Sequence, residues 1–321
     1  MSAQLEFDPP ASVTAQAPAM VALATKVGEP EAYQQAPVLS LKLAVSRYDT
    51  ATVEARDDKE ILVSFEDATG SVIDYADIPH DDLVAVFQAV DVLRAHLGRP
   101  KETSGLDITI QKFIPFDTHL GGRAATAAAV LVALSGLWDA SIAREDLARM
   151  APRIGDGVAA AITGGAIITH HNAIEELVTP VLVHSELAMV VVPAAADLGN
   201  AEMFEAVRQL RHTTDDEQHA VLEFQTELLQ AVAQGDAKQV ALMMHNEFQP
   251  ALVSMLPEHN DWLTAGMDED ALAAVTVDRG PSLVFIADDM HAANELAERF
   301  EQRMEIAAVA EYGPVSGAHL V

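Results

Sequence analysis

Residues 114–126 read Ile-Pro-Phe-Asp-Thr-His-Leu-Gly-Gly-Arg-Ala-Ala-Thr and lead directly into an alanine-rich stretch at residues 127–138. Apolar residues alternate with polar ones just before this segment, which predicts a strand over residues 105–114. A strand, a glycine-containing loop and a helix in this order are typical of sites where backbone N–H groups hold a phosphate. The loop lacks several of the usual glycines and the usual hydroxyl, so the sequence indicates a phosphate-binding fold whose phosphate site has been rebuilt.

The composition sets the class of protein. The chain has 321 residues, half of them apolar, which is enough for two domains with separate cores. The absence of cysteine excludes disulfides, thiolate nucleophiles and cysteine-bound metals. The longest weakly polar run, residues 124–138, falls short of the roughly 20 residues of a membrane span, so we predict a buried helix. Residues 1–12 carry acid and proline in place of a secretory signal, and we expect a cytoplasmic protein.

The charge balance is strongly acidic. The chain has 49 Asp and Glu residues against 19 Lys and Arg residues, which gives a net charge of -30. Such a charge repels nucleic-acid backbones and anionic lipid surfaces, so we expect neither nucleic-acid nor membrane binding. An anionic small ligand would need local cations or a helix N-terminus to overcome this field. A general adaptation to solubility or ionic strength remains the simpler explanation of the acidity.

In the first half, short β-rich runs at residues 51–55 and 60–65 predict a hairpin around a charged turn. Helical spacing of apolar residues predicts a helix over residues 82–97. Ser141 is a plausible N-cap for a helix that extends to about Ile154.

The second half begins with a predicted buried strand at residues 187–192. Three predicted helices follow, and then a helix that lies between two strands, which suggests a small open-faced α+β sandwich. The three helices cover residues 200–211, 219–233 and 237–245; the last helix covers residues 289–302, and its flanking strands cover residues 282–287 and 306–310. We place the two domains at residues 1–178 and 179–321.

Several segments, in the same order along the chain, resemble the 4-diphosphocytidyl-2-C-methyl-D-erythritol kinase family of the GHMP kinase superfamily. This family consists of ATP-dependent enzymes of non-mevalonate isoprenoid synthesis. The resemblance implies an α+β fold of two domains with the active site in the cleft between them. The matching segments are residues 17–21, 44–49, 114–134, 137–138, 154–158, 164–165, 246–247, 280–282 and 313–315.

The resemblance assigns the substrate side of the site. The family has a lysine beside the substrate hydroxyl, and Met20 occupies that position here, with Ala22 in place of an asparagine. The histidine that holds the cytosine ring in the family corresponds to Gln34, which follows a possible stacking residue, Tyr33. Tyr33 and Gln34 are therefore the candidate substrate-binding residues.

The resemblance also assigns the catalytic and phosphate-binding positions. The catalytic aspartate of the family aligns with Gly157, and Asp156, one position earlier, is the candidate replacement for this base. In the third glycine motif, residues 277–282, charged residues replace small ones. The candidate nucleotide-binding residues are Leu120, Gly121, Gly122, Arg123 and Ala124.

Arg123 stands where the family has a glycine and supports two hypotheses. A guanidinium at a helix N-terminus can hold a phosphate or carboxylate through two hydrogen bonds. Alternatively, Arg123 pairs with a nearby acid such as Asp117 or Asp278, which we favour because acids are so abundant. Asp117 and His119 could form an acid–base pair, but an ordinary loop hydrogen bond is the simpler expectation.

Histidines and acids elsewhere suggest a metal site, either at the neighbours His170 and His171 or in a second group within residues 212–219. A solvated polar linker is the better explanation of the second group, so we predict no metal site. Leu242, Met243 and Met244 are predicted to be core residues. The second group consists of His212, Asp215, Asp216 and His219.

Two functions remain open. The first is a noncatalytic paralogue, a pseudoenzyme that binds a nucleotide, another anionic small molecule or a protein partner of unknown identity. The motivation is the simultaneous change at four family motifs, because phosphoryl transfer depends on positioned charges. The alternative is an active kinase that uses Asp156 and Arg123 with ATP and Mg²⁺. Its substrate would be 4-diphosphocytidyl-2-C-methyl-D-erythritol or a related alcohol.

Overall fold

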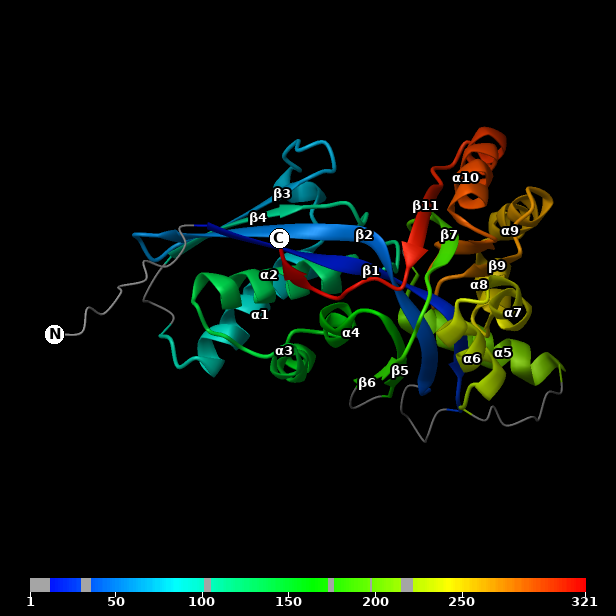
Figure 1. Cartoon of the computed structure of the whole chain (residues 1–321), viewed down its shortest axis with the longest axis horizontal. Coiled ribbons are helices and arrows are strands. Elements are labelled where there is room, and N and C mark those ends of the chain that lie inside the picture. The colour runs from blue at the N-terminus through cyan, green and yellow to red at the C-terminus, as the bar shows by residue number, and fades with distance from the viewer. Residues whose placement is uncertain (1–11, 30–35, 101–104, 173–175, 197, 215–221) are drawn as a thin grey trace.

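The computed structural model describes residues 12–29, 36–100, 105–172, 176–196, 198–214 and 222–321. Figure 1 labels the helices and strands of these segments. The strands are β1 Ser12–Val27, β2 Val38–Arg56, β3 Ile61–Glu66, β4 Gly105–Gln111, β5 Ala166–His171, β6 Glu176–Val181, β7 Leu187–Val192, β8 His245–Asn246, β9 Ala273–Thr276, β10 Leu283–Ala287, β11 Val309–Gly313 and β12 His319–Leu320. The helices are α1 His80–His96, α2 Gly122–Leu137, α3 Arg144–Met150, α4 Val158–Thr163, α5 Asn200–Thr214, α6 Thr226–Gln234, α7 Ala237–Met243, α8 Gln249–Met255, α9 Glu258–Asp268 and α10 Met290–Met304.

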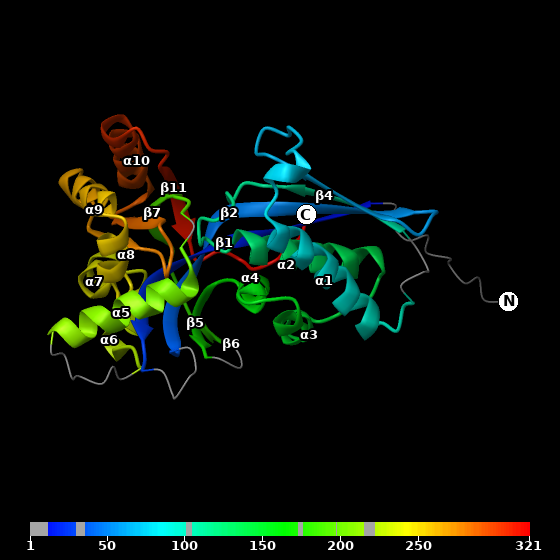
Figure 2. The ribbon, with the colours of Figure 1, turned by 180° about the vertical axis from the view of Figure 1, so that it is seen from behind.

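The first sheet is built around the long antiparallel pair β1 and β2 and has the order β12-β1-β2-β4-β3. The hairpin β5–β6 pairs with the first half of β2, and β8 pairs with β1. Helices α2 and α4 pack on β1, while α1 and α3 cover them from outside, so all four lie on one face of the sheet (Figures 1 and 2). The mixed helices and strands confirm the predicted α+β class.

The predicted hairpin of residues 51–55 and 60–65 is wrong, although both segments are strands. Strand β4 lies between β2 and β3, antiparallel to β2 and parallel to β3. The turn after β2 therefore passes over the end of β4, and Asp58 O accepts a hydrogen bond from Gly105 N at 2.6 Å. The physical reason is burial: the apolar residues of β4 are among the most buried of the chain, and an inner position covers them better than an edge.

Helix α2 carries the core of the first domain. The phosphate-loop residues Gly122–Thr126 already belong to it, so the helix begins five residues before the alanine-rich stretch. It is buried along nearly its whole length between α1 and the sheet, as its alanines allow by permitting close approach. No helix in the described part of the chain is long and apolar enough to cross a membrane.

The second sheet has the order β11-β7-β10-β9, with every pair antiparallel. Its strand at residues 187–192 matches the prediction, but the predicted open face is wrong. Alternate residues of β7 pack with α6 and α7 on one side and with α9 and α10 on the other. All six residues of β7 are apolar and buried, a pattern that requires cover on both faces.

The predicted ends of several elements shift. Helix α3 begins at Arg144 after Ala143, and Ser141 has a backbone φ of 45° instead of the extended conformation of an N-cap. The helix predicted over residues 219–233 begins only at Thr226 as α6, because residues 222–225 are not helical, and residues 219–221 lie outside the described ranges. Strand β11 begins three residues later than predicted.

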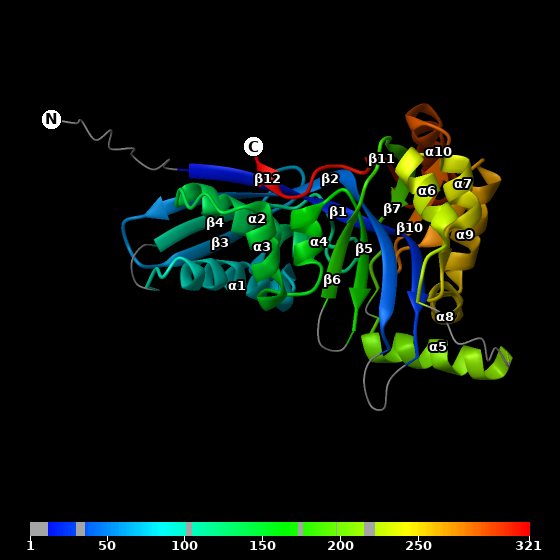
Figure 3. The same ribbon diagram turned by 60° about the horizontal axis from the view of Figure 1, so that its bottom comes forward.

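The division of the chain at residue 178 stays a prediction. Strand β6 runs across that position as the partner of β5 in the first sheet. Near the other end, β12 leaves the second domain and pairs with β1, so that His319 faces Gln16 in the strand register. Figure 3 shows β12 beside β1, far from the helices of the second domain.

Candidate functional site

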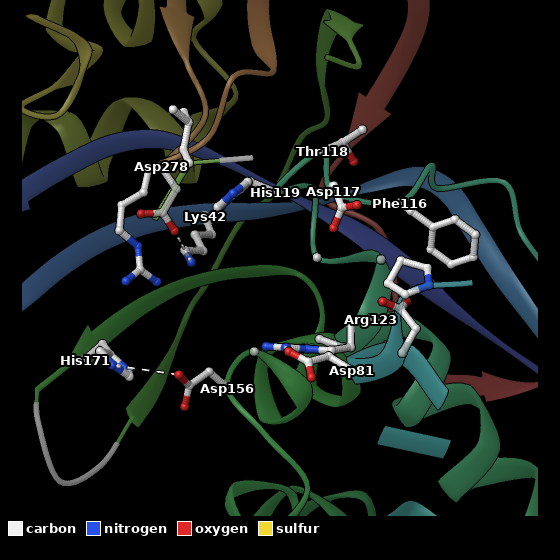
Figure 4. A pocket seen from close by; sticks show the side chains of 18 of the residues that line it. Lys42, Asp81, Phe116, Asp117, Thr118, His119, Arg123, Asp156, His171 and Asp278 are labelled. Atoms are coloured by element: carbon white, nitrogen blue, oxygen red, sulfur yellow. Dashed lines mark hydrogen bonds and ion pairs between the residues drawn. The ribbon is translucent and has the colours of Figure 1, made fainter. Parts of the chain in front are cut away.

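A cavity of about 590 Å³ lies where the two sheets meet. Its walls come from the amino ends of α1 and α2, from the inner half of β2, from the hairpin β5–β6 and from the turn between β9 and β10 (Figure 4). The charged and titratable residues of the cavity come from segments that lie far apart in the sequence. Those residues are Lys42, His80, Asp81, Asp82, Asp117, His119, Arg123, Asp156, His171, Glu176, Asp278 and Arg279.

The amino end of α2 opens into this cavity. Gly121 precedes the helix with a φ of 78°, a left-handed conformation that favours glycine, and no side chain caps the helix there. The first N–H groups of a helix have no partner within it, and here they belong to Gly122, Arg123 and Ala124 at the cavity wall. The fit to a phosphate is therefore good. Leu120 is the exception among the predicted nucleotide-binding residues, because it is fully buried and its carbonyl accepts a hydrogen bond from Met20 N at 2.9 Å.

A buried charged network supports α2 from behind. The Lys112 ammonium donates to a carboxylate oxygen of Asp49 and, at 3.1 Å, to Thr126 Oγ1. The other Asp49 oxygen accepts the N–H groups of Phe113 and Ile114, both at 2.9 Å. The ammonium also lies close beneath Gly122, since a β-carbon there would be 3.2 Å from Lys112 Nζ. The network fixes the end of β4 against the first turn of α2, a connection that the sequence analysis missed.

Arg123 does reach into the cavity, but its partner is neither of the predicted acids. Arg123 Nη1 lies 3.4 Å from Asp81 Oδ2 at the start of α1, and both side chains are exposed. Asp278 is instead bound by Lys42, with 2.7 Å between the ammonium nitrogen and Oδ2. Burial opposes the charge of Asp278, but the ammonium of Lys42 and the guanidinium of Arg279 outweigh it and hold the pKa of Asp278 at about 2. The exposed Arg123–Asp81 contact is weak, and Arg123 can turn to a ligand.

Asp156 lines the cavity beside the strand hairpin. Its side chain is 65% exposed, and its Oδ2 lies 3.9 Å from His171 Nε2. Gly157, the position of the aspartate in the resemblance, has a φ of 81°, and its N–H donates to Glu176 Oε2 at 2.8 Å. The sequence analysis did not single out Glu176. Only the pairing of β5 with β6, which sets His171 opposite Glu176, brings this carboxylate to the site.

Met20 lies in an apolar cluster outside the cavity lining. It is buried with Ala44, Ala160 and Ile167 and contributes no polar group. The ammonium group of the cavity wall comes instead from Lys42, whose backbone pairs with Ala22 across β1 and β2. Lys42 was also missed, because nothing in its local sequence separates it from an ordinary strand lysine.

Asp117 and His119 both line the cavity and both have a positive φ. Burial lowers the pKa of His119 below its ordinary value, and among the acids that oppose this shift Asp278 acts more strongly than Asp117. The strongest electrostatic partner of His119 is therefore in the second domain, not next to it in sequence. The predicted hydrogen bond of this loop is made instead by Thr118, whose hydroxyl donates to Pro115 O at 2.9 Å.

The remaining candidates separate into those that the structure describes and those that it does not. Tyr33 and Gln34 lie outside the described residues, as do Asp215, Asp216 and His219. His170 and His171 are on β5, and no group of three metal-binding side chains occurs in the described ranges. Met243 and Met244 pack against the main core, as predicted, but the prediction is wrong for Leu242, which is 78% exposed.

Comparisons with known proteins agree with this architecture. Residues 85–167 match the family model "GHMP kinases N terminal domain". The 4-diphosphocytidyl-2-C-methyl-D-erythritol kinase of a Nocardioides species is 32% identical over 95% of this chain and 99% of its own length. The kinase of the same name from Mycolicibacterium gilvum is 31% identical over 98% of this chain and 95% of its own length.

Solved structures show the same fold at lower sequence identity. A crystal structure of 4-(cytidine 5'-diphospho)-2C-methyl-D-erythritol kinase has a TM-score of 0.72 and 20% identity, and it covers 93% of this chain and 98% of its own. Mevalonate kinase from L. major in complex with R-mevalonate has a TM-score of 0.73 and 16% identity, over 97% of this chain and 99% of its own. Relatives above 30% identity along almost the entire chain, together with this fold, show that the chain belongs to the 4-diphosphocytidyl-2-C-methyl-D-erythritol kinase family, within the GHMP kinases.

Proposed function

We propose that this chain is an ATP-dependent kinase with an alcohol as acceptor, and that 4-diphosphocytidyl-2-C-methyl-D-erythritol is the first substrate to test. The observation that carries the proposal is the uncapped amino end of α2 in a cavity of about 590 Å³ that also contains carboxylates. A cavity of this size accommodates a small-molecule ligand. The names of the relatives support the reaction and the acceptor.

The residues at α2 suit the phosphates of ATP. The N–H groups of Gly122, Arg123 and Ala124 would bind phosphate oxygens, and Arg123 would leave Asp81 to add a charged contact. The buried Lys112 ammonium behind Gly122 is paired with Asp49 and supports this end of the cavity without adding net charge to it. Mg²⁺ takes oxygen ligands, and Asp81 and Asp156 are exposed carboxylates that would hold it together with the phosphates, where it would neutralise their charge.

The transfer itself is a displacement at the terminal phosphorus. The hydroxyl oxygen of the acceptor forms a new bond to this phosphorus, the bond to the bridging oxygen breaks, and ADP leaves. The hydroxyl proton needs a nearby base, and a carboxylate serves this purpose in many kinases. The cavity provides such carboxylates on the side of the β5–β6 hairpin.

A second function is favoured by a specific observation. Met20 and Gly157 occupy the positions where the resemblance implies a lysine and an aspartate, and Met20 is buried among apolar residues. A protein that binds the nucleotide or another anionic ligand without transferring phosphate would keep the end of α2 and lose these groups. We propose it as the alternative to catalysis.

The experiment measures both binding and turnover. With ATP, Mg²⁺ and 4-diphosphocytidyl-2-C-methyl-D-erythritol, we expect acceptor-dependent release of ADP in a coupled assay and a higher melting temperature with ATP. We expect R123A to raise the KM for ATP by roughly tenfold, which is the effect of one charged hydrogen bond of about 1.5 kcal/mol. The control is R149A, which removes an arginine that is 72% exposed on α3.

Each outcome separates the two functions. Stabilisation by ATP without ADP release would favour the noncatalytic alternative. If ATP neither stabilises the protein nor releases ADP, the kinase function and noncatalytic binding of ATP are both wrong. An unchanged KM in R123A would remove Arg123 from the nucleotide site while leaving the reaction intact.

A further inference from the structure

Glu176 opens strand β6 and holds its carboxylate at the wall of the cavity. Oε2 accepts the Gly157 N–H at 2.8 Å, so the carboxylate is fixed by the backbone just before α4. The residue is half-buried, and its backbone lies opposite His171 in the antiparallel pair β5–β6. This anchoring uses Oε2 and leaves Oε1 for another partner, because no described residue donates a hydrogen bond to Oε1.

The anchor lies next to the phosphate-binding end of α2. A β-carbon at Gly157 would come 3.2 Å from the β-carbon of Ala124, whose N–H is one of the uncapped donors. Gly157 therefore joins the two features: its N–H holds Glu176, and its Cα faces the start of α2. An alcohol that approaches a phosphate on this end of α2 would pass close to Glu176.

Three of the other cavity carboxylates are less suited to take a proton from an alcohol. Asp278 is neutralised by Lys42 at 2.7 Å. Asp81 is 73% exposed and pairs with Arg123, and Asp156 is 65% exposed, so water competes for both. A carboxylate held in one orientation loses little conformational entropy when it binds an alcohol, and the hydrogen bond from Gly157 N–H holds Glu176 in this way.

We propose that Glu176, rather than Asp156, is the catalytic base of the phosphoryl transfer, an inference that depends on the proposed kinase function. The acceptor hydroxyl donates its hydrogen bond to Oε1. As the oxygen bonds to the terminal phosphorus and the bond to ADP breaks, the proton moves to Oε1. It then passes to solvent, and the carboxylate is restored. Glu176 on β6 thus supplies the carboxylate that the resemblance places at position 157, where this chain has a glycine.

The test compares E176Q, E176D, D156N and the wild type with ATP, Mg²⁺ and 4-diphosphocytidyl-2-C-methyl-D-erythritol. Loss of a positioned base lowers a rate by roughly 10²- to 10⁴-fold, so we expect E176Q to lower kcat by this factor with the KM for ATP changed by less than about threefold. E176D should restore part of kcat, and D156N should lose much less than E176Q. The matched control is E54Q, which removes an exposed carboxylate of β2 far from the cavity.

A structural role of Glu176 would give a different result. E176Q keeps an oxygen that can accept the Gly157 N–H, and its melting temperature shows whether the fold survives. A residue with only a structural role would not give partial recovery of kcat in E176D, and that comparison holds even if E176Q is less stable.

The failures are distinguishable. An active wild type with equal kcat in E176Q would overturn the role of Glu176 and leave the kinase function in place, as would a greater loss in D156N than in E176Q. A wild type that releases no ADP would overturn the kinase function and the base together.

Discussion

Asp82 in the first turn of α1 is an acid that the fold keeps away from water. Its side chain is 6% exposed. Burial raises the pKa of Asp82 to about 6, although the charges of Lys112 and Arg123 oppose the shift. The folded protein therefore binds a proton at Asp82 more tightly than the unfolded chain does, and this contribution to stability is lost as the pH rises from about 4 to about 6.

We predict that D82N removes this loss. Above pH 7 the variant should be more stable than the wild type by about 2 to 3 kcal/mol in the free energy of unfolding, because asparagine carries no charge to bury. Urea unfolding between pH 5 and pH 8 measures the difference, which should grow with pH and level off near 7. D74N, at an exposed position, is the control. A difference between D82N and wild type that does not change with pH would contradict the prediction.

At this scale the sequence predicted only part of the site. Arg123 and Asp156 were predicted and do line the cavity: Arg123 belongs to the local phosphate-loop motif, and Asp156 lies next to a position of a second family motif. Lys42 and Glu176 were missed, because each enters the site through strand pairing with residues far away. The partner of Arg123 was wrong for the same reason: the start of α1 lies beside α2 only in the folded chain.

Among the elements, the end of α4 depends on an unusually close contact. Gly164 has a φ of 63°, and a β-carbon there would lie 2.0 Å from the backbone nitrogen of Gly317. Gly165 has a φ of 70°, but a β-carbon there would meet nothing within 4 Å. The two neighbours thus share a left-handed backbone and differ in the space around them.

We predict that G165A costs about 1 to 2 kcal/mol, the strain of a left-handed alanine, while G164A costs at least about 3 kcal/mol because the segment before β12 must also move. Chemical unfolding of both variants gives the comparison. Equal losses would show that the segment moves away easily and that the contact with α4 contributes little.

Element types were more predictable than their neighbours in space. The strand at residues 187–192 follows from a short apolar run, and the helix that became α1 follows from the helical spacing of its apolar residues. The position of β4 between β2 and β3 depends on which strand gains most from burial, a comparison that no local pattern contains. The cover on both faces of β7 could have been read from its uninterrupted apolar run.

For the whole molecule, the net charge of -30 acts on every part of the fold. Repulsion among like charges favours the expanded chain and weakens with salt, since the screening length falls to about 10 Å at 0.1 M. We predict that the melting temperature rises by several degrees between about 0.05 and 0.5 M NaCl. Sucrose, a nonionic stabiliser, serves as the comparison: it should raise the melting temperature equally at both salt concentrations. A melting temperature that stays constant or falls with NaCl would contradict the prediction.

The α+β class and the family could be predicted at this scale because motifs along nearly the whole chain keep their order. The geometry of the cavity could not be predicted, since it depends on how the two sheets meet.

Strand β12 is the last element of the first sheet to be synthesised. Its partner β1 is made at the opposite end of the chain, and Val321 N also donates to Thr14 O at 3.0 Å. During synthesis, the ribosome has produced the entire second domain before these residues emerge from the exit tunnel. The backbone groups of β1 that pair with β12 therefore stay unpaired while the rest of the protein is translated, and other strands can compete for them.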